Sequence, residues 1–297
     1  MTVLVTGASG LVGSRLVARL RAAAVPVRAF VRAPGALGAP VDGGLSIVTG
    51  EIEDLAAVRR GVQGCGAVVH LANASGVTDE ARVRAVNVGG TEHVLVASRE
   101  AGVGRVIFTS SVSAMRARLG PYGRSKRMAE DLVRASGLPF VILRPSLVYG
   151  GDAPGLMTLL ARHLRTLPVM PVIGDGRMPL DPIHVDDLCG VIEACLTRDD
   201  VLGRTYDVLG PDRVTLDELL TRLGASLGVH RPRLHLPAGA ALLLARVLGR
   251  VMARPPLTVD NVLGMTSPAR VDGSAAARDF PIAWTRLDVG LRGVVGA

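Results

Sequence analysis

Short apolar runs alternate with amphipathic segments through the first half of the chain, and this alternation constrains the fold more than any other feature. We predict strands at 3–5, 25–31, 45–48, 67–71, 105–109 and 140–143, and helices at 11–24, 55–62, 86–101 and 122–136. The strands are apolar throughout, which is typical of parallel strands covered on both faces. The pattern therefore predicts an α/β fold with a doubly wound parallel sheet, whose ligand lies beyond the carboxyl ends of the strands.

The second half of the chain is less regular. Helices are expected at 156–167, 216–227 and 238–253, a strand at 204–208, and a Pro- and Gly-rich loop with a short strand at 168–182. We divide the chain into a nucleotide-binding domain at 1–150 and a smaller substrate-binding region at 151–297, which partly folds back on the sheet.

Composition excludes several classes of protein. A hydrophobic content of 48% with 20% charged residues fits a globular protein. The net charge is +8, but the arginines are scattered with no run of five, so we favour a solvated basic surface and predict no nucleic-acid partner. The six histidines share no ligand spacing, so no metal site is predicted.

The cysteines and the amino-terminal segment bear on location. Cys65, Cys189 and Cys195 show no CxxC spacing, which favours free buried thiols in a reducing compartment. A strand at 2–5 takes the place that a signal peptide would need, and no apolar stretch reaches 18 residues. We therefore expect a cytoplasmic protein without a transmembrane segment, either a monomer or a homodimer.

Glycines at positions 7, 10 and 13 follow the first strand in a GxxGxxG pattern. Such a loop lets the backbone approach a pyrophosphate closely, and the following helix offers unpaired N–H groups and a positive dipole end. Because the pattern lies between a strand and an amphipathic helix, it predicts a phosphate-binding loop.

The GxxGxxG spacing resembles that of the short-chain dehydrogenase/reductase superfamily. Tyr122 and Lys126 match its YxxxK pattern, Ser111 best matches its active-site serine, and Asn87 matches an asparagine in a helix beside the sheet. The segments 143–150 and 182–187 resemble the RPxxVYG and hVdDva segments of the extended and atypical branches. The chain is most similar to bacterial NAD-dependent epimerase/dehydratase-like proteins related to the NAD(P)H-binding accessory subunit of respiratory complex I.

The resemblance implies a Rossmann-type domain that binds NAD(P), with Tyr122 as general acid/base and Ser111 holding the substrate oxygen. It implies that Lys126 bonds the nicotinamide ribose, that Glu51 and Ile52 lie near adenine, and that 71–73 runs beside the ribose and pyrophosphate. The full set of cofactor residues that we expect is Gly7, Ser9, Gly10, Leu11, Val12, Gly13, Arg32, Glu51, Ile52, Leu71, Ala72, Asn73, Asn87, Thr109, Tyr122, Lys126, Pro145, Leu147 and Val148.

Cofactor choice depends on the end of the second strand, where an acid binds the ribose hydroxyls of NAD and an arginine neutralises the 2′-phosphate of NADP. Residues 27–34 contain no acid, and Arg32 lies 19 residues beyond Gly13. We predict NADP(H), with NAD(H) as the alternative. Arg32 would have no such role if it were an ordinary surface residue of this arginine-rich chain.

Lys126 is the only lysine among 34 basic residues, and it follows Tyr122 by one helical turn. A free tyrosine has a pKa near ~10, and a nearby ammonium lowers it. We therefore expect Lys126 to lower the pKa of Tyr122. Met115, Arg116 and Arg118, in the short loop between Ser111 and Tyr122, are either substrate neighbours or solvent-facing residues.

Three other features have two interpretations each. Asp186 and Asp187 could serve chemistry, but we favour a helix cap. Arg144 is either structural or neutralises a phosphate. The helix at 238–253 is mostly apolar, with Arg246, Arg250 and Arg254 in i, i+4 register. It either packs on the core with a basic outer stripe, which we favour, or makes peripheral contact with an acidic membrane through 238–254.

Three functions follow from these residues. We favour an NAD(P)(H)-dependent oxidoreductase of the short-chain dehydrogenase/reductase type that acts on a small carbonyl or alcohol. The alternatives are a nucleotide-sugar epimerase or dehydratase with tightly bound NAD, and a non-catalytic NAD(P)H-binding accessory or sensor protein. The retained Tyr122 and Lys126 argue against the third.

Overall fold

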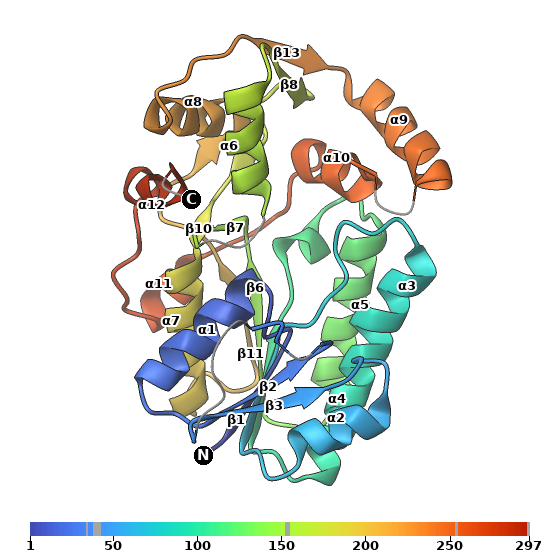
Figure 1. Ribbon diagram of the computed structural model, residues 1–297, viewed down its shortest axis with the longest axis vertical. Helices are drawn as coiled ribbons and strands as arrows, with labels where there is room; N and C mark the ends of the chain where they lie inside the picture. The colour runs from blue at the N-terminus through green and yellow to red at the C-terminus, as the bar shows by residue number, and fades with distance from the viewer. Residues whose placement is uncertain (34, 38–42, 152–154, 253–254, 296–297) are drawn as a thin grey trace.

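A seven-stranded, fully parallel sheet forms the centre of the computed structural model, which describes residues 1–33, 35–37, 43–151, 155–252 and 255–295 (Figure 1). The strand order is β11 (Arg204–Val208), β6 (Phe140–Pro145), β5 (Arg105–Thr109), β4 (Ala67–His70), β1 (Val3–Thr6), β2 (Val27–Val31) and β3 (Leu45–Thr49). The chain moves outward from β1 in one direction and then returns to the other side of it. The predicted doubly wound sheet is therefore confirmed.

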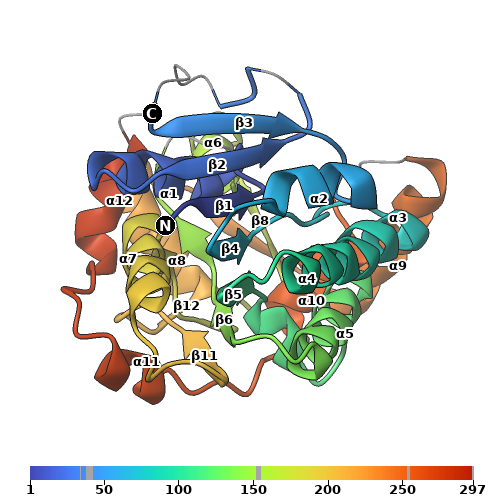
Figure 2. The ribbon, with the colours of Figure 1, turned by 90° about the horizontal axis from the view of Figure 1, so that it is seen from below.

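Helices cover both faces of the sheet (Figures 1 and 2). One face carries α1 (Leu11–Ala22), α7 (Val185–Thr197) and α11 (Ser274–Asp279). The other carries α2 (Leu55–Val62), α3 (Glu80–Arg84), α4 (Gly90–Glu100) and α5 (Pro121–Ala135). Two hydrophobic clusters, one on each face, form the core that fixes the strand ends in place.

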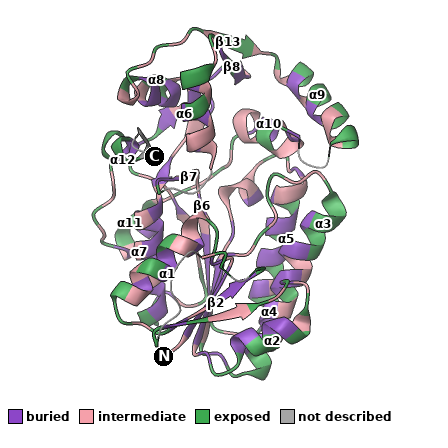
Figure 3. Cartoon of the chain, viewed as in Figure 1, coloured by how far each residue is buried: buried purple, intermediate pink, exposed green. Residues whose placement is uncertain are grey.

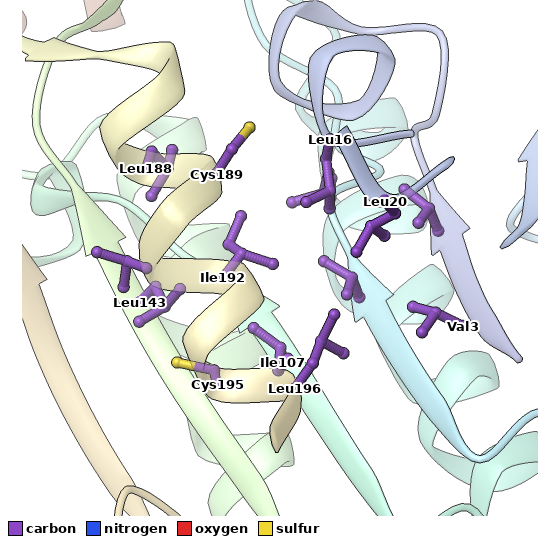
Figure 4. Packing of buried hydrophobic residues seen from close by; sticks show 14 of the residues in the cluster. Val3, Leu16, Leu20, Ile107, Leu143, Leu188, Cys189, Ile192, Cys195 and Leu196 are labelled. Carbon is purple, nitrogen blue, oxygen red and sulfur yellow. The ribbon is translucent and has the colours of Figure 1, made fainter. Parts of the chain in front are cut away.

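The packing of α7 shows why the strands are apolar on both sides. Its Leu188, Ile192 and Leu196 are buried together with Ile107 and Leu143 of the sheet (Figure 4). Helix α1 contributes Leu16 and Leu20 to the same cluster. Cys65, Cys189 and Cys195 are buried free thiols, as predicted.

The remaining elements lie beyond the carboxyl ends of the strands. They form three two-stranded sheets from β7 (Val148–Tyr149) with β10 (Ile183–His184), β9 (Pro179–Leu180) with β12 (Val214–Thr215), and β8 (Met170–Ile173) with β13 (Arg233–Leu236). The helices there are α6 (Leu156–Thr166), α8 (Leu216–Ser226), α9 (Ala238–Val251), α10 (Val259–Thr266) and α12 (Leu287–Val295). Strand β11 and helix α7, although they follow residue 150, belong to the layers of the main sheet.

Several local expectations need correction. The helix predicted at 86–101 begins earlier, as α3 followed by a π-helical turn at Ala85–Gly89 and then α4. Helix α7 was not predicted, and its N-cap is His184 rather than an aspartate. Asp186 instead binds Arg15 of α1 at 2.5 and 2.9 Å. Asp187 accepts hydrogen bonds from the backbone N–H and hydroxyl of Thr285, both at 2.8 Å.

Helix α9 also differs from the arrangement that we favoured. Only Ala241 and Ala245 are buried, whereas Leu243, Leu244, Val247 and Val251 are exposed. Much of the helix is therefore coloured as exposed in Figure 3. Arg254 lies outside the described residues. Within the described ranges, no helix is long and apolar enough to cross a membrane.

Candidate functional site

The glycine loop joins β1 to α1 at the edge of the sheet where the strands end. Gly7 has φ +65°, and a Cβ there would lie 2.7 Å from the backbone nitrogen of Ala72. A Cβ on Gly13 would lie 2.2 Å from the Gly7 carbonyl oxygen. Helix α1 has Gly10 as its N-cap, with no side-chain cap and no acid in its first turn. Its first N–H groups therefore remain available for an anion, as a phosphate-binding loop requires.

A buried polar network supports this loop from below. The hydroxyl of Thr6 accepts hydrogen bonds from the backbone N–H groups of Leu71 and Ala72, both at 3.2 Å, and contacts Nδ1 of His70 at 2.7 Å. Nε2 of His70 contacts the Thr91 hydroxyl at 3.0 Å, and that hydroxyl donates to a carbonyl oxygen. His70 therefore accepts at Nδ1 and donates at Nε2, as a neutral ring. Burial lowers its pKa to about 3.

A cleft of about 700 Å³ opens in front of the loop, and we call it the glycine-loop cleft. Nine of the predicted cofactor residues line it: Gly7, Ser9, Gly10, Arg32, Glu51, Ile52, Leu71, Ala72 and Asn73. Arg32 is exposed and makes no ion pair with any residue that the structure describes. Arg82, a lining residue that the sequence did not single out, pairs with Glu53 and with Glu51.

Lys126 lies in the second turn of helix α5 with its side chain almost fully buried. Its ammonium donates one hydrogen bond, to the Thr109 carbonyl oxygen at 2.8 Å, and lies 5.0 Å from the centroid of the Phe108 ring. Burial lowers the pKa of Lys126 to about 7, although the nearby Glu130 opposes this shift. Two of the three donors of this ammonium have no partner among the described residues and are therefore available to the hydroxyl groups of a ligand.

Tyr122 and Ser111 come together one turn before Lys126. Burial raises the pKa of Tyr122 to about 12, the side-chain hydrogen bond with Ser111 lowers it, and Asp260 raises it. The expected lowering by Lys126 is not found. Its nitrogen lies 5.9 Å from the centroid of the Tyr122 ring, and the removal of the phenol from water dominates. The phenol is therefore protonated at neutral pH.

A second cavity, of about 410 Å³, lies against Tyr122, and we call it the Tyr122 cavity. It is lined by the predicted residues Ser111, Tyr122, Leu147 and Val148 and by a larger group from the second half of the chain, in which apolar side chains outnumber the polar residues Asp181, Arg213, Asp260 and Asn261. Ser75 lines this cavity and also the glycine-loop cleft. The two spaces therefore adjoin near the catalytic candidates.

Asp260 of α10 is a site residue that sequence reasoning missed. Its Oδ2 accepts a hydrogen bond from the Tyr122 backbone N–H at 3.2 Å. Helix α5 has Gly120 as its N-cap without a side-chain cap, and a Cβ there would lie 2.2 Å from Asp260 Oδ1. Asp260 thus caps α5 from a segment 138 residues away, and Gly120 leaves room for it. Burial raises the pKa of the Asp260 carboxyl.

Arg116 faces the Tyr122 cavity rather than solvent alone. Its guanidinium donates to the carbonyl oxygens of Leu263 at 2.6 Å and Ser267 at 3.2 Å, which ties the loop before α5 to α10. Its Nε is buried without a partner among the described residues. Burial lowers the pKa of Arg116.

Arg144 has a structural role. It binds the buried carboxylate of Glu130 through two hydrogen bonds of 2.8 and 2.6 Å. The same carboxylate accepts from the Ser110 hydroxyl at 2.6 Å and from Arg134 at 2.7 Å. This network fixes α5 against the ends of β5 and β6, beneath the site.

The other predicted residues lie behind the two cavities rather than in them. Asn87 bonds the backbone of Ala74 at 2.7 and 3.1 Å and the Ser125 hydroxyl at 2.9 Å, so it holds the loop after β4 against α5. Thr109 presents a buried hydroxyl that has no described partner. The remaining members of this group, which are packing positions near the loop or at a strand end, are Leu11, Val12, Gly13 and Pro145.

The residues of the glycine-loop cleft fit a nicotinamide dinucleotide. The loop has no room for a Cβ at Gly7 or Gly13, the start of α1 offers free N–H groups, and Lys126 retains unused donors. Among the described residues, no cluster of three His, Cys, Asp or Glu side chains could hold a metal ion.

Comparison with known proteins agrees with this geometry. The model of the NAD dependent epimerase/dehydratase family matches residues 3–208. The chain is 30% identical to the ceramide reductase of Caulobacter vibrioides over 94% of this chain and 83% of that protein. It is 26% identical to the 2-alkyl-3-oxoalkanoate reductase of Shewanella oneidensis over 93% of this chain and 80% of that protein.

Two solved structures are similar over nearly the whole chain. The dTDP-glucose 4,6-dehydratase DesIV from Streptomyces venezuelae, with NAD and TYD bound, has a TM-score of 0.82 and 26% identity, and the match covers 100% of this chain and 96% of that one. MoeE5 in complex with UDP-glucuronic acid and NAD has a TM-score of 0.80 and 25% identity, with 100% and 98% covered.

Proposed function

The chain belongs to the NAD dependent epimerase/dehydratase family of oxidoreductases, and from this premise we propose that it is an NADP(H)-dependent reductase of a small apolar carbonyl compound. One observation carries the proposal: Ser111 and Tyr122 line a largely apolar cavity that adjoins the glycine-loop cleft, and the Lys126 nitrogen lies 5.9 Å from the centroid of the Tyr122 ring. A bound nicotinamide supplies the hydride. The protein positions the carbonyl, the cofactor and the proton donor.

The proton chemistry favours reduction. With a pKa raised to about 12 by burial, the Tyr122 phenol holds its proton at neutral pH and can give it to the developing alkoxide. The Ser111 hydroxyl, which lines the same cavity as the phenol, would hold the same oxygen. The Lys126 ammonium would bond ribose hydroxyls with its unused donors and stabilise negative charge on the phenol after proton transfer.

Two observations support NADP(H) over NAD(H). Arg32 is exposed at the rim of the glycine-loop cleft, beyond the end of β2, with no described ion-pair partner. Glu51 and Glu53, the cleft's acids after β3, are already paired with Arg82. A guanidinium without a carboxylate partner suits a phosphate monoester.

The Tyr122 cavity supports an apolar substrate. Tyr122 is the only aromatic residue among its described lining residues, so no second ring is present to stack a nucleotide base. The lining includes Leu147, Leu156, Leu180 and Met265. The relatives named as ceramide and 2-alkyl-3-oxoalkanoate reductases act, by those names, on compounds with alkyl chains. These points favour a carbonyl compound with an alkyl chain over a nucleotide sugar.

A substrate screen tests the proposal. Purified protein is mixed with NADPH or NADH and with 3-oxoacyl compounds of increasing chain length, and nicotinamide absorbance is followed. We expect oxidation of NADPH that grows with chain length and requires added cofactor in stoichiometric amounts. Conversion of a nucleotide sugar by protein that retains its cofactor, without net oxidation, would contradict the proposal and favour the epimerase alternative.

A further inference from the structure

Helix α9 exposes a continuous apolar surface. The described chain exposes ten large hydrophobic side chains, and five of them fall between residues 243 and 252: Leu243, Leu244, Val247, Val251 and Met252. Their exposed fractions run from 43% for Met252 to 74% for Val251. Leu243, Val247 and Val251 are four residues apart and therefore form one row along the helix. Scattered apolar residues need no explanation, but a row of this kind marks an interaction surface.

The inner side of α9 explains why this row faces outward. Ala241 and Ala245 pack against Ile173 and Val262 in a small cluster, and these short side chains let α9 lie close to α10. Near the other end of α9, a Cβ on Gly249 would lie 3.4 Å from the Thr78 side chain, so the glycine lets the helix approach this residue closely. The Met252 carbonyl accepts a hydrogen bond from the Thr78 hydroxyl. Contacts near both ends therefore hold the inner face of the helix in place, and its row of large side chains cannot turn inward.

Positive charge accompanies the apolar row. Arg246 and Arg250 are exposed, lie one turn apart, and each follows a member of the row by three residues, so they form a parallel basic row beside it. Neither arginine makes an ion pair with any described residue. The helix sequence AGAALLLARVLGRV contains no acid, and the whole chain carries a net charge of +8.

The apolar row and the basic row together indicate which kind of partner fits this face of α9. In a symmetric dimer the same face would meet itself, which would bring the arginines of the two copies together with no acid on α9 between them. An anionic lipid surface satisfies both rows at once, because acyl chains cover the apolar row and headgroups pair with the arginines. With 14 residues, α9 is too short to span a bilayer, which takes about 20.

We propose that α9 docks the protein on an anionic membrane surface, with Leu243, Val247 and Val251 in the acyl boundary and Arg246 and Arg250 among the headgroups. Helix α10 would then lie directly behind the membrane contact. Its Met265 packs in the cluster beneath α9 and also lines the Tyr122 cavity. Docking would therefore bring that cavity close to the lipid surface, and the inference holds whatever reaction the cavity supports.

Sedimentation with lipid vesicles tests this docking. The full chain is mixed with vesicles of phosphatidylcholine alone or with an equal part of phosphatidylglycerol, at low and high salt. We expect binding to the anionic vesicles only, and a decrease at high salt. The triple variant Leu243→Ser, Val247→Ser, Val251→Ser should lower the partition coefficient roughly a hundredfold or more. The pair Arg246→Gln, Arg250→Gln should lower it about thirtyfold.

Matched controls come from helices that lie away from α9 (Figure 1). Val289→Ser alters an equally exposed residue of α12, and the pair Arg60→Gln, Arg99→Gln removes two exposed arginines from α2 and α4. Both should leave vesicle binding unchanged, and thermal unfolding checks that every variant is folded. Equal binding to neutral vesicles, or full binding by the triple variant, would overturn the proposal. A dimer that the triple variant abolishes, without vesicle binding, would assign this face to a second copy and also overturn it.

Discussion

The glycine-loop cleft and the Tyr122 cavity adjoin near the catalytic candidates, yet they are built in different ways. The cleft is shaped by backbone at the ends of neighbouring strands, with Gly7 and Gly13 packed so closely that no Cβ fits. The cavity is shaped by side chains from distant segments, such as Arg116 and Asp260. Backbone geometry provides a general site for a dinucleotide, whereas under our proposal the side chains of the cavity determine the substrate.

The largest effect is expected at the backbone of the cleft. Gly13→Ala places a Cβ 2.2 Å from the Gly7 carbonyl oxygen, so the loop and α1 must separate. We expect a loss of about 3 kcal/mol of unfolding free energy, together with weakened cofactor binding. Gly10→Ala is the control, since its Cβ would lie 3.3 Å from the same oxygen. Equal unfolding midpoints for the two variants in chemical denaturation would show that the close packing at Gly13 does not stabilise the fold.

The rim of the cleft gives a smaller and more selective effect. Arg32→Ser removes the exposed guanidinium that lines it. We expect NADPH affinity to fall about tenfold to a hundredfold, the worth of charge-assisted hydrogen bonds, while NADH affinity is unchanged. Fluorescence titration with both cofactors measures this, with Arg60→Ser as control. A parallel loss for both cofactors would assign Arg32 to general attraction rather than to 2′-phosphate recognition.

The cavity side is tested at Asp260, the cap that α10 supplies to α5. Asp260→Ala should cost about 1–2 kcal/mol of stability and lower turnover, because the Tyr122 end of α5 loses its cap. NADPH affinity should stay constant, since Asp260 does not line the cleft. Asp260→Asn keeps an acceptor oxygen and should restore much of the turnover. Loss of NADPH affinity in Asp260→Ala would contradict the separation of the two regions.

The buried network of Thr6, His70 and Thr91 beneath the glycine-loop cleft predicts that the stability of the fold depends on pH. The pKa of His70 is lowered to about 3 in the folded chain, so below pH ~6.5 the unfolded chain binds a proton that the folded chain does not. Stability should therefore fall as pH falls, by about 1 kcal/mol between pH 6 and pH 5. His70→Gln should reduce this slope, which urea denaturation at the two pH values measures. An unchanged slope in the variant would mean that other groups cause the pH dependence.

The same contrast explains how much the sequence could predict. The parallel sheet and the glycine loop were predictable because each depends on contiguous residues, such as the apolar run before Gly7. The carboxyl ends of parallel strands meet at one edge, so residues 71–73 could be assigned to the cleft as well. The direction of the pKa shift of Tyr122 was predicted wrongly, because sequence spacing reveals the nearby ammonium but not the extent of burial.

The cavity side was less predictable for a physical reason. Asp260 contacts Tyr122 although the two residues are 138 positions apart in the sequence, and no periodic pattern of residues predicts such a contact. Helix α9 was predicted as a helix, but its apolar residues were expected inside, because hydrophobic spacing identifies an apolar face without saying what covers it. Asp186 was taken for a cap, whereas in the structure it is the second residue of α7 and binds Arg15.

The most direct test of the proposed chemistry is Tyr122→Phe, measured for turnover and for NADPH affinity in the same preparation. Removal of the phenol hydroxyl removes the proton donor and leaves the lining of the glycine-loop cleft intact. We predict that carbonyl reduction falls by at least about a hundredfold while the dissociation constant for NADPH is unchanged. Turnover equal to that of the unaltered protein would contradict the assignment of Tyr122 as the general acid.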